Sequence, residues 1–164
     1  MIEITEATLQ DVPLIRQLAK QTFHITYLPL LPKEKVDYLF SLMYSLSSLA
    51  EQMKNGQQFI FAKDERGCLG YASYEINCKK NGVTKIHKLY VLPAAQGKGI
   101  GKMLVDWIAA IARENKNQIL ALNVYRGNPA IEFYKKIGFK KMREVNIDAG
   151  DGFVFNDFEM EMGL

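Results

Sequence analysis

The stretch LYVLPAAQGKGIGKML, residues 89–104, joins an apolar run to an amphipathic segment through three alternating glycines. The apolar run breaks at Pro93, and apolar residues at helical spacing follow the glycines. Glycine lets backbone amides approach a ligand closely, and the first amides of a helix have no partner within that helix. The stretch is therefore either a tight strand-to-helix turn or a cradle for an anion such as phosphate.

The spacing of the glycines excludes two common phosphate-binding motifs. A P-loop needs Ser or Thr after its lysine, but Met103 follows Lys102. A dinucleotide fingerprint needs G-x-G-x-x-G, and Gly101 comes one residue too early for it. What remains is Q-x-x-G-x-G at residues 96–101, with lysines close by. This pattern alone leaves phosphate binding and a bare turn equally open.

Hydrophobic periodicity around this stretch predicts one mixed α/β domain over residues 1–164. A short strand, three helices and an antiparallel meander of three strands come first; a helix, a buried strand, a short helix and a closing strand pair follow. The strands on either side of the crossover helix should be parallel. The expected strands are 2–6, 58–63, 68–76, 83–92, 118–124, 139–147 and 153–162, and the expected helices begin at Thr8, Lys33, Ser48, directly after the glycines, and at Asn128.

Composition indicates an ordinary globular protein. A chain of 164 residues can bury one sizeable core, and its net charge of +3 has no dense basic cluster of the kind that binds nucleic acid. Cys68 and Cys78 have no His or Cys neighbour at a metal-ligand spacing. The N-terminal residues do not resemble a signal peptide, and no apolar run is long enough to span a membrane. We expect a reduced, cytoplasmic protein without a metal, a nucleic-acid partner or a membrane anchor.

Two blocks of the sequence resemble one protein family. QGKGIG, residues 96–101, looks like the Q/R-x-x-G-x-G/A signature of the GCN5-related N-acetyltransferases, which cradles the pyrophosphate of acetyl-coenzyme A. NPAIEFYKKIGF, residues 128–139, is similar to the family's second conserved block, which ends in A-x-x-F-Y-x-x-x-G-F. The resemblance implies a central mixed, twisted sheet of six to seven strands flanked by about four helices, splayed between the fourth and fifth strands.

The same resemblance implies that acetyl-coenzyme A is the acetyl donor. The pantetheine arm would lie between the splayed strands like an added strand, against the backbone of residues 89–91, where an N–H donates to the developing oxyanion. Asn128 would both cap its helix and contact the pantetheine arm. The full set of implied coenzyme contacts is Leu89, Tyr90, Val91, Gln96, Gly97, Lys98, Gly99, Ile100, Gly101, Lys102, Asn128, Tyr134 and Lys136.

The resemblance places Tyr134 at the position of the family's general acid. A phenol with an ordinary pKa near 10 stays protonated at neutral pH and can protonate a departing thiolate. By residue type alone, a Phe-Tyr pair on a short helix is as consistent with core packing.

The general base is less defined, because many relatives carry a Glu on the fourth strand and this chain has KIHKLYV there. His87 shares a strand face with Leu89 and Val91 if the strand is regular, and its ordinary pKa near 6.5 suits a base. Glu75 on the preceding strand is the second candidate. A half-buried, hydrogen-bonded histidine without catalytic function is the alternative.

The acceptor is expected to be a primary amine of a small molecule, by direct transfer in a ternary complex. The first helices and the closing hairpin resemble, more weakly, bacterial spermidine/spermine N-acetyltransferases. A polycation needs carboxylates near the cleft. A protein N-terminal or lysine acetyltransferase and a non-catalytic coenzyme-binding regulatory domain remain alternatives, and a homodimer is the default for such chains. The candidate carboxylates are Glu34, Asp37, Asp148, Asp151 and Asp157. The alternative for the closing hairpin is a turn without an acceptor role, because turns favour Asp and Gly.

Overall fold

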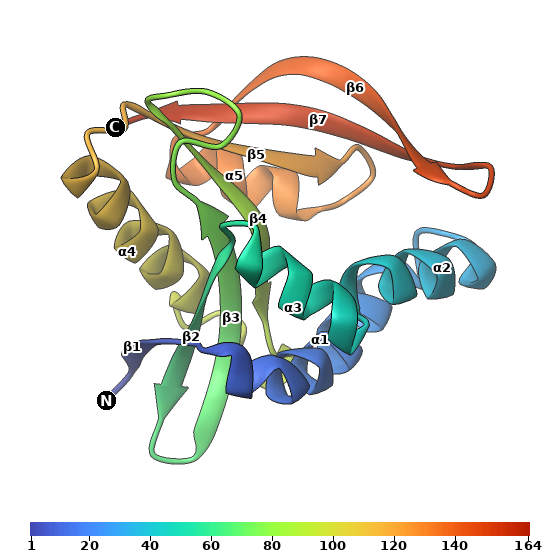
Figure 1. The fold of residues 1–164 in the computed structure, drawn as a ribbon, viewed down its shortest axis with the longest axis horizontal. Helices are drawn as coiled ribbons and strands as arrows, with labels where there is room; N and C mark the ends of the chain where they lie inside the picture. Colours follow the sequence, from blue (N-terminus) through green and yellow to red (C-terminus); the bar gives the residue numbers. More distant parts are fainter.

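The computed structural model describes all residues from 1 to 164 and contains a seven-stranded sheet with the order β1-β2-β3-β4-β5-β7-β6 (Figure 1). All neighbouring strands pair antiparallel except β4 and β5. The strands are β1 (Glu3–Glu6), β2 (Gln58–Asp64), β3 (Gly67–Glu75), β4 (Val83–Val91), β5 (Ile119–Tyr125), β6 (Lys140–Gly150) and β7 (Phe153–Gly163). The α-helices are α1 (Val12–Tyr27), α2 (Lys33–Tyr44), α3 (Leu46–Lys54), α4 (Ile100–Glu114) and α5 (Ala130–Ile137).

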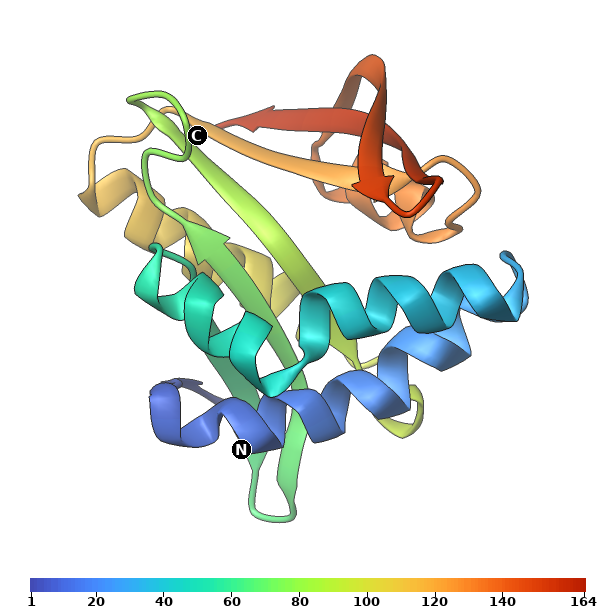
Figure 2. The ribbon, with the colours of Figure 1, turned by 45° about the vertical axis from the view of Figure 1, so that its right-hand side comes forward.

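Two hydrophobic clusters lie on opposite faces of the sheet. One contains Leu104 and Ile108 of α4, Ile131 of α5 and residues of β4 and β5. The other contains Ile15 of α1 with residues of α2, α3, β2 and β3. Figure 1 and Figure 2 show the matching layers, with α4 on one side of the sheet and α1–α3 on the other. Apolar stripes on these helices bury both faces of the central strands.

The parallel strands β4 and β5 separate after a short paired region. Their ladder runs from Val83 opposite Ile119 to Ile86 opposite Leu122 and goes no further, although β4 continues to Val91. Figure 2 shows β4 and β5 moving apart along their length. The backbone of residues 87–91 therefore has a sheet partner on the β3 side only, which opens a gap in the middle of the sheet.

A β-bulge interrupts β4 beside this gap. Ser73 pairs with Lys88, but the next residue, Tyr74, pairs with Ile86, so His87 is the extra residue of the bulge. Leu89 and Val91 pack against the α4 cluster, whereas His87 contacts Glu75, which lies beside Gly56 after α3. The expectation that His87 shares a face with Leu89 and Val91 is wrong, because the extra residue shifts the alternation of side chains by one.

The predicted order of elements is confirmed, including the antiparallel meander and the parallel pair around the crossover helix. The structure has the five α-helices that the periodicity predicts, one more than the family resemblance implies, together with two short 3-10 helices. The third helix starts at Leu46 rather than at Ser48, because the Ser45 side chain accepts a hydrogen bond from the Ser48 amide and caps it. None of the helices combines the length and apolar character that crossing a membrane requires.

Candidate active site

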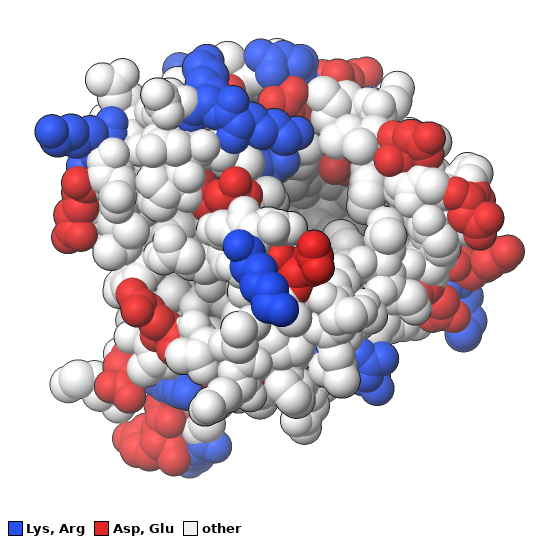
Figure 3. All heavy atoms as spheres, in the orientation of Figure 1, with Lys and Arg blue, Asp and Glu red and all other residues white.

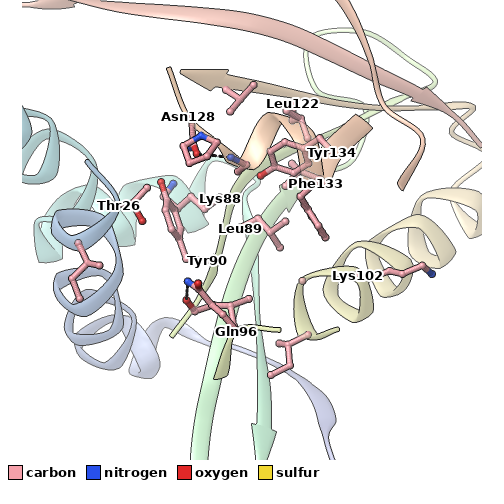
Figure 4. A pocket seen from close by; sticks show the side chains of 18 of the residues that line it. Thr26, Lys88, Leu89, Tyr90, Gln96, Lys102, Leu122, Asn128, Phe133 and Tyr134 are labelled. Atoms are coloured by element: carbon pink, nitrogen blue, oxygen red, sulfur yellow. Dashed lines mark hydrogen bonds between the residues drawn. The ribbon is translucent and has the colours of Figure 1, made fainter. Parts of the chain in front are cut away.

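The gap between β4 and β5 is the floor of a cleft of about 820 Å³. One wall comes from the end of α1 and the other from β5 and α5, and the glycine loop closes one end. Figure 3 shows a hollow in this face of the molecule whose interior is mostly uncharged, with charged side chains around it. Figure 4 shows Leu89 and Tyr90 on β4 and Gln96 in the loop that follows it, with Asn128 and Tyr134 across from Thr26 of α1. A space of this size and shape fits the arm of a large cosubstrate.

The glycine loop places unpaired backbone amides at the mouth of the cleft. Gly97 and Gly99 have φ angles of +81° and +78°, a left-handed conformation that a side chain would strain. Gly99 is the N-cap of α4. At Gly101 a Cβ atom would come within 3.2 Å of the Phe133 ring, so this glycine allows α4 and α5 to pack closely. The start of the 15-residue helix α4 thus offers its dipole and its first amides to an anion.

The residues expected to contact the coenzyme lie around this one cleft, with one exception. Lys98 is exposed and does not line the cleft. Lys102 lines it but pairs with Asp106 at 2.7 Å. The Ile100 side chain is buried in the α4 core, so its amide rather than its side chain is what a ligand can reach. The others that line the cleft are Leu89, Tyr90, Val91, Gln96, Gly97, Gly99, Gly101, Asn128, Tyr134 and Lys136.

Tyr134 projects from α5 into the cleft. Its ring packs edge-on against Phe133 and Phe139, which fixes the direction of the hydroxyl. Burial raises the pKa of Tyr134 well above 10, so the phenol is protonated at any physiological pH. Figure 4 shows its ring near Asn128 and Leu89, across the gap in the sheet. A protonated phenol at this point can donate to a group held in the gap.

A hydrogen-bonded chain of side chains crosses the cleft next to Tyr134. Asn128 donates to the Tyr27 hydroxyl at 3.3 Å, and the Tyr90 hydroxyl donates to the same oxygen at 3.4 Å. The Asn128 side-chain oxygen Oδ1 accepts from the Ala130 amide at 2.9 Å, so the expected side-chain cap at the start of α5 is present. Tyr27 was not among the predicted site residues. The sequence around Tyr27 contains no motif that predicts a site residue. Tyr27 contacts Asn128 only because the fold brings the end of α1 next to the start of α5.

The two candidate bases lie in contact. His87 Nε2 is 3.0 Å from Glu75 Oε1, across the β3–β4 pair. Burial, with the charges of Lys85 and Lys88, lowers the pKa of His87 to about 4, and Glu75 acts in the opposite direction. The ring is therefore neutral at pH 7 and donates from Nε2 to Glu75, which leaves Nδ1 with a lone pair. His87 lines the cleft and Glu75 does not.

Lys88 is a second residue that the sequence did not single out. Its ammonium donates to the side-chain oxygens of Gln52 and Gln57 and lies over the rings of Tyr44 and Phe59. Burial lowers the pKa of Lys88 to about 7. Leu89 belongs to a family motif and His87 is a residue type that often acts as a base, so both were predicted as site residues. A lysine in a strand usually indicates a solvent-exposed edge, so the sequence did not predict a buried Lys88.

Among the carboxylates expected to bind a cationic acceptor, Asp157 alone is partly buried and outside any ion pair. It lies opposite Tyr125, whose ring faces Tyr27, and burial raises its pKa. Asp37 is taken by Lys33 and His24, and Asp148 accepts from the Gly150 amide within the hairpin turn. Asp151 and Glu34 are exposed.

A splayed parallel strand pair, a glycine-rich helix start at its mouth and a buried phenol across the gap define a coenzyme-A-dependent acyltransferase. Residues 15–139 match the model of the Acetyltransferase (GNAT) family. The chain belongs to that family, and it is an acetyl-coenzyme-A-dependent N-acetyltransferase.

One curated relative and two solved structures are similar to this chain over nearly its whole length, and the structures share its fold. The spermidine N(1)-acetyltransferase of Thermoplasma acidophilum is 25% identical over 166 residues, which cover 98% of this chain and 96% of the relative. The crystal structure of PaiA N-acetyltransferase from the same organism, in complex with coenzyme A, has a TM-score of 0.81 at 24% identity and covers 100% of this chain and 99% of its own. The ribosomal-protein-S18-alanine N-acetyltransferase of Escherichia coli has a TM-score of 0.74 at 16% identity, covering 99% and 94%.

Proposed function

We propose that the enzyme transfers the acetyl group directly from acetyl-coenzyme A to a primary amine of a small molecule, with polyamines as the acceptor class. The observation that carries this proposal is the composition of one cleft. The glycine loop, Tyr134 and His87 line this cleft, and Asp157 lies outside the lining but close enough to Tyr27 of α1 to act on its pKa, on the side that an acceptor would enter. Donor and acceptor can therefore be held at the same time, which is what direct transfer in a ternary complex requires.

In this mechanism the protein supplies an oxyanion donor, a base and an acid. The backbone of residues 89–91, without a strand partner on the β5 side, binds the pantetheine arm and donates an N–H to the thioester oxygen. The amine attacks in its uncharged form, and its nitrogen becomes strongly acidic as the C–N bond forms. His87, whose pKa is lowered to about 4, accepts that proton through Nδ1 only at this stage, and Glu75 stabilises the resulting imidazolium. Tyr134 protonates the coenzyme A thiolate as it leaves. The amine attacks the carbonyl carbon, the C–S bond breaks, and no acetyl-enzyme forms.

The carboxylates support a cationic acceptor with more than one ammonium group. Asp157 has no ion-pair partner, and Lys85, Arg126 and Lys35 act on it only at longer range. A second ammonium of a polyamine would provide such a partner while the reacting amine reaches the thioester. The 25% identity to the Thermoplasma spermidine N(1)-acetyltransferase over nearly the whole chain supports the same acceptor class.

The decisive experiment is coenzyme A thiol release from acetyl-coenzyme A with a panel of polyamines, small monoamines, aminoglycosides and peptides with free N-termini or lysines. Release confined to polyamines, with intersecting initial-rate lines, is the expected result. Release only with peptides would replace the acceptor class by a protein substrate. Coenzyme binding without release by any amine would indicate a regulatory domain. Asp157→Asn should raise KM for spermidine more than KM for a monoamine, with Asp151→Asn as the exposed control.

A further inference from the structure

Three side chains with metal-binding atoms converge at the end of β3 and the start of β4. Glu75, Cys78 and His87 each present one such atom, and all three atoms lie within 4.8 Å of one another. His87 Nε2 is 3.0 Å from Glu75 Oε1 and 3.9 Å from Cys78 Sγ. Cys78 is buried, and the other two are partly buried. The spacing E-x₂-C-x₈-H matches no known metal-binding motif, so the sequence alone does not predict this cluster and only the folded structure brings the three residues together.

The geometry differs from that of a nucleophilic triad. In a Cys-His-carboxylate triad the imidazole contacts the sulfur through one ring nitrogen and the carboxylate through the other. Here the sulfur and the carboxylate both face Nε2. Ligands around a tetrahedral ion at normal Zn–N, Zn–O and Zn–S distances would be roughly 3.3–3.6 Å apart. The observed separations reach those values with movements on the order of 1 Å.

The segment that carries Cys78 is fixed before any ion binds. The Cys78 amide donates to the Val83 carbonyl at 3.0 Å. The side chains of Asn77 and Asn117 bond to each other at 2.9 Å, and Asn117 also accepts from Thr84 at 2.7 Å. Glu75 and His87 are held by the β3–β4 pairing and its bulge. Such an arrangement of rigid supports lowers the cost of assembling a site.

The charges of the cluster match a divalent ion. A thiolate and a carboxylate together carry two negative charges, and the neutral imidazole adds none. Lys85 and Lys88 lie near enough to His87 to oppose a cation, so the two anionic ligands are needed to offset them. The mixed sulfur, nitrogen and oxygen ligands suit zinc and cobalt rather than magnesium or calcium.

We propose that Glu75, Cys78 and His87 bind one zinc-class divalent ion, with a fourth coordination position open to water on the cleft side. Binding forms metal–S, metal–N and metal–O bonds. The imidazole proton moves from Nε2 to Nδ1, which frees the Nε2 lone pair for the ion, and the thiol proton is released to solvent, with no electron transfer. The ion coordinates both His87 and Glu75, so His87 can no longer accept a proton from the acceptor amine, and the ion inhibits acetyl transfer. This consequence, though not the binding itself, rests on the proposed function.

Cobalt(II) is the probe for the site, because a cobalt–thiolate bond gives a near-ultraviolet charge-transfer band. The reduced full-length chain should bind one equivalent and show this band together with the visible bands of a four-coordinate ion. Cys78→Ser should abolish the charge-transfer band, and the matched control Cys68→Ser should keep it, since Cys68 lies at the far end of β3. Glu75→Gln, which keeps both thiols, should lower cobalt affinity at least tenfold. A band that is absent, or that survives Cys78→Ser, overturns the proposal.

Inhibition is measured separately, as acetylated product by mass spectrometry with zinc added. Zinc should inhibit the wild-type enzyme, and Cys78→Ser should need at least tenfold more zinc for the same inhibition. Undiminished product formation with zinc demonstrably bound would overturn the inhibitory consequence and the base role of His87, and it would leave the metal site established. A protein that binds no cobalt but acetylates amines would overturn the metal site and leave the proposed function intact.

Discussion

The rings of Phe133 and Phe139 pack edge-on against Tyr134 and fix the orientation of its ring. The Tyr134 hydroxyl can therefore donate a proton in one direction only. Tyr134→Phe keeps this packing and removes only the proton donor. We expect kcat to fall by about 100-fold, in the range of a lost general acid, while the Kd for coenzyme A changes little. Steady-state kinetics together with calorimetric binding of coenzyme A measure the two effects. An unchanged kcat would remove Tyr134 from the mechanism.

Lys88 makes the stability of the protein depend on pH. Its pKa is about 7 in the folded protein and near the usual 10.5 in the unfolded chain, so the unfolded chain binds more protons between these values. Stability therefore rises as the pH increases from 7 toward 10, by about 2 kcal/mol between pH 7 and pH 9.

Lys88→Met removes the titrating group while keeping an unbranched side chain of similar size. We expect urea unfolding of this variant at pH 7 and pH 9 to lack the rise in stability that the wild type shows. If the variant and the wild type gained stability equally, the pKa of Lys88 would not be the cause.

At the scale of single elements, the start of α4 combines a backbone requirement with the proposed binding of the coenzyme pyrophosphate. Gly99 has a φ of +78° with open space around it, and Gly152 in the β6–β7 turn has a φ of +81°, also in open space. Alanine at either position should cost roughly 1–2 kcal/mol of stability, because a Cβ atom strains the left-handed conformation. We expect Gly99→Ala alone to weaken coenzyme A binding as well. Equal coenzyme affinity in the two variants would mean that the amides after Gly99 do not hold the pyrophosphate.

The bulge in β4 shows how one residue changes the chemistry of an element. Without it, His87 would face the α4 core with Leu89 and Val91. With it, His87 contacts Glu75 and Cys78 on the other side. A strict alternation along KIHKLYV could not reveal this, because a bulge depends on how the strand pairs with its neighbour.

At the scale of the whole molecule, the closing hairpin contacts the helical layer through Tyr38. Its hydroxyl donates to the Ala149 carbonyl at 2.7 Å, and its ring stacks on Phe153. Figure 1 shows the β6–β7 turn extending over α2. The contact therefore links the closing hairpin to the helical layer at α2.

Tyr38→Ala should free the hairpin without unfolding the core. Hydrogen exchange of the amides in 148–155 should become faster, while exchange in α4 stays unchanged. Tyr38→Phe, which keeps the stacking and loses one hydrogen bond, should have a smaller effect of about 1 kcal/mol. A uniform increase in exchange across the chain would show that Tyr38 supports global stability rather than the position of the hairpin.

The sequence by itself determined the order of the elements and the family, because both rest on short-range patterns. Helical and strand periodicities, the caps at Thr8 and Asn128, and the glycines of residues 96–101 act over a few residues, and each can be read locally. The proposed coenzyme contacts follow from them, since the loop and α5 carry most of these residues within two contiguous blocks.

The tertiary structure alone decided which distant side chains meet. Asn128 and Tyr27 are 101 residues apart, Lys88 is buried by glutamines of another element, and Glu75, Cys78 and His87 meet through a bulge and a turn. These contacts depend on strand register, on layer packing and on one extra residue in a strand. None of these leaves a periodic signal, because each is set by the balance of pairing and burial over the whole sheet.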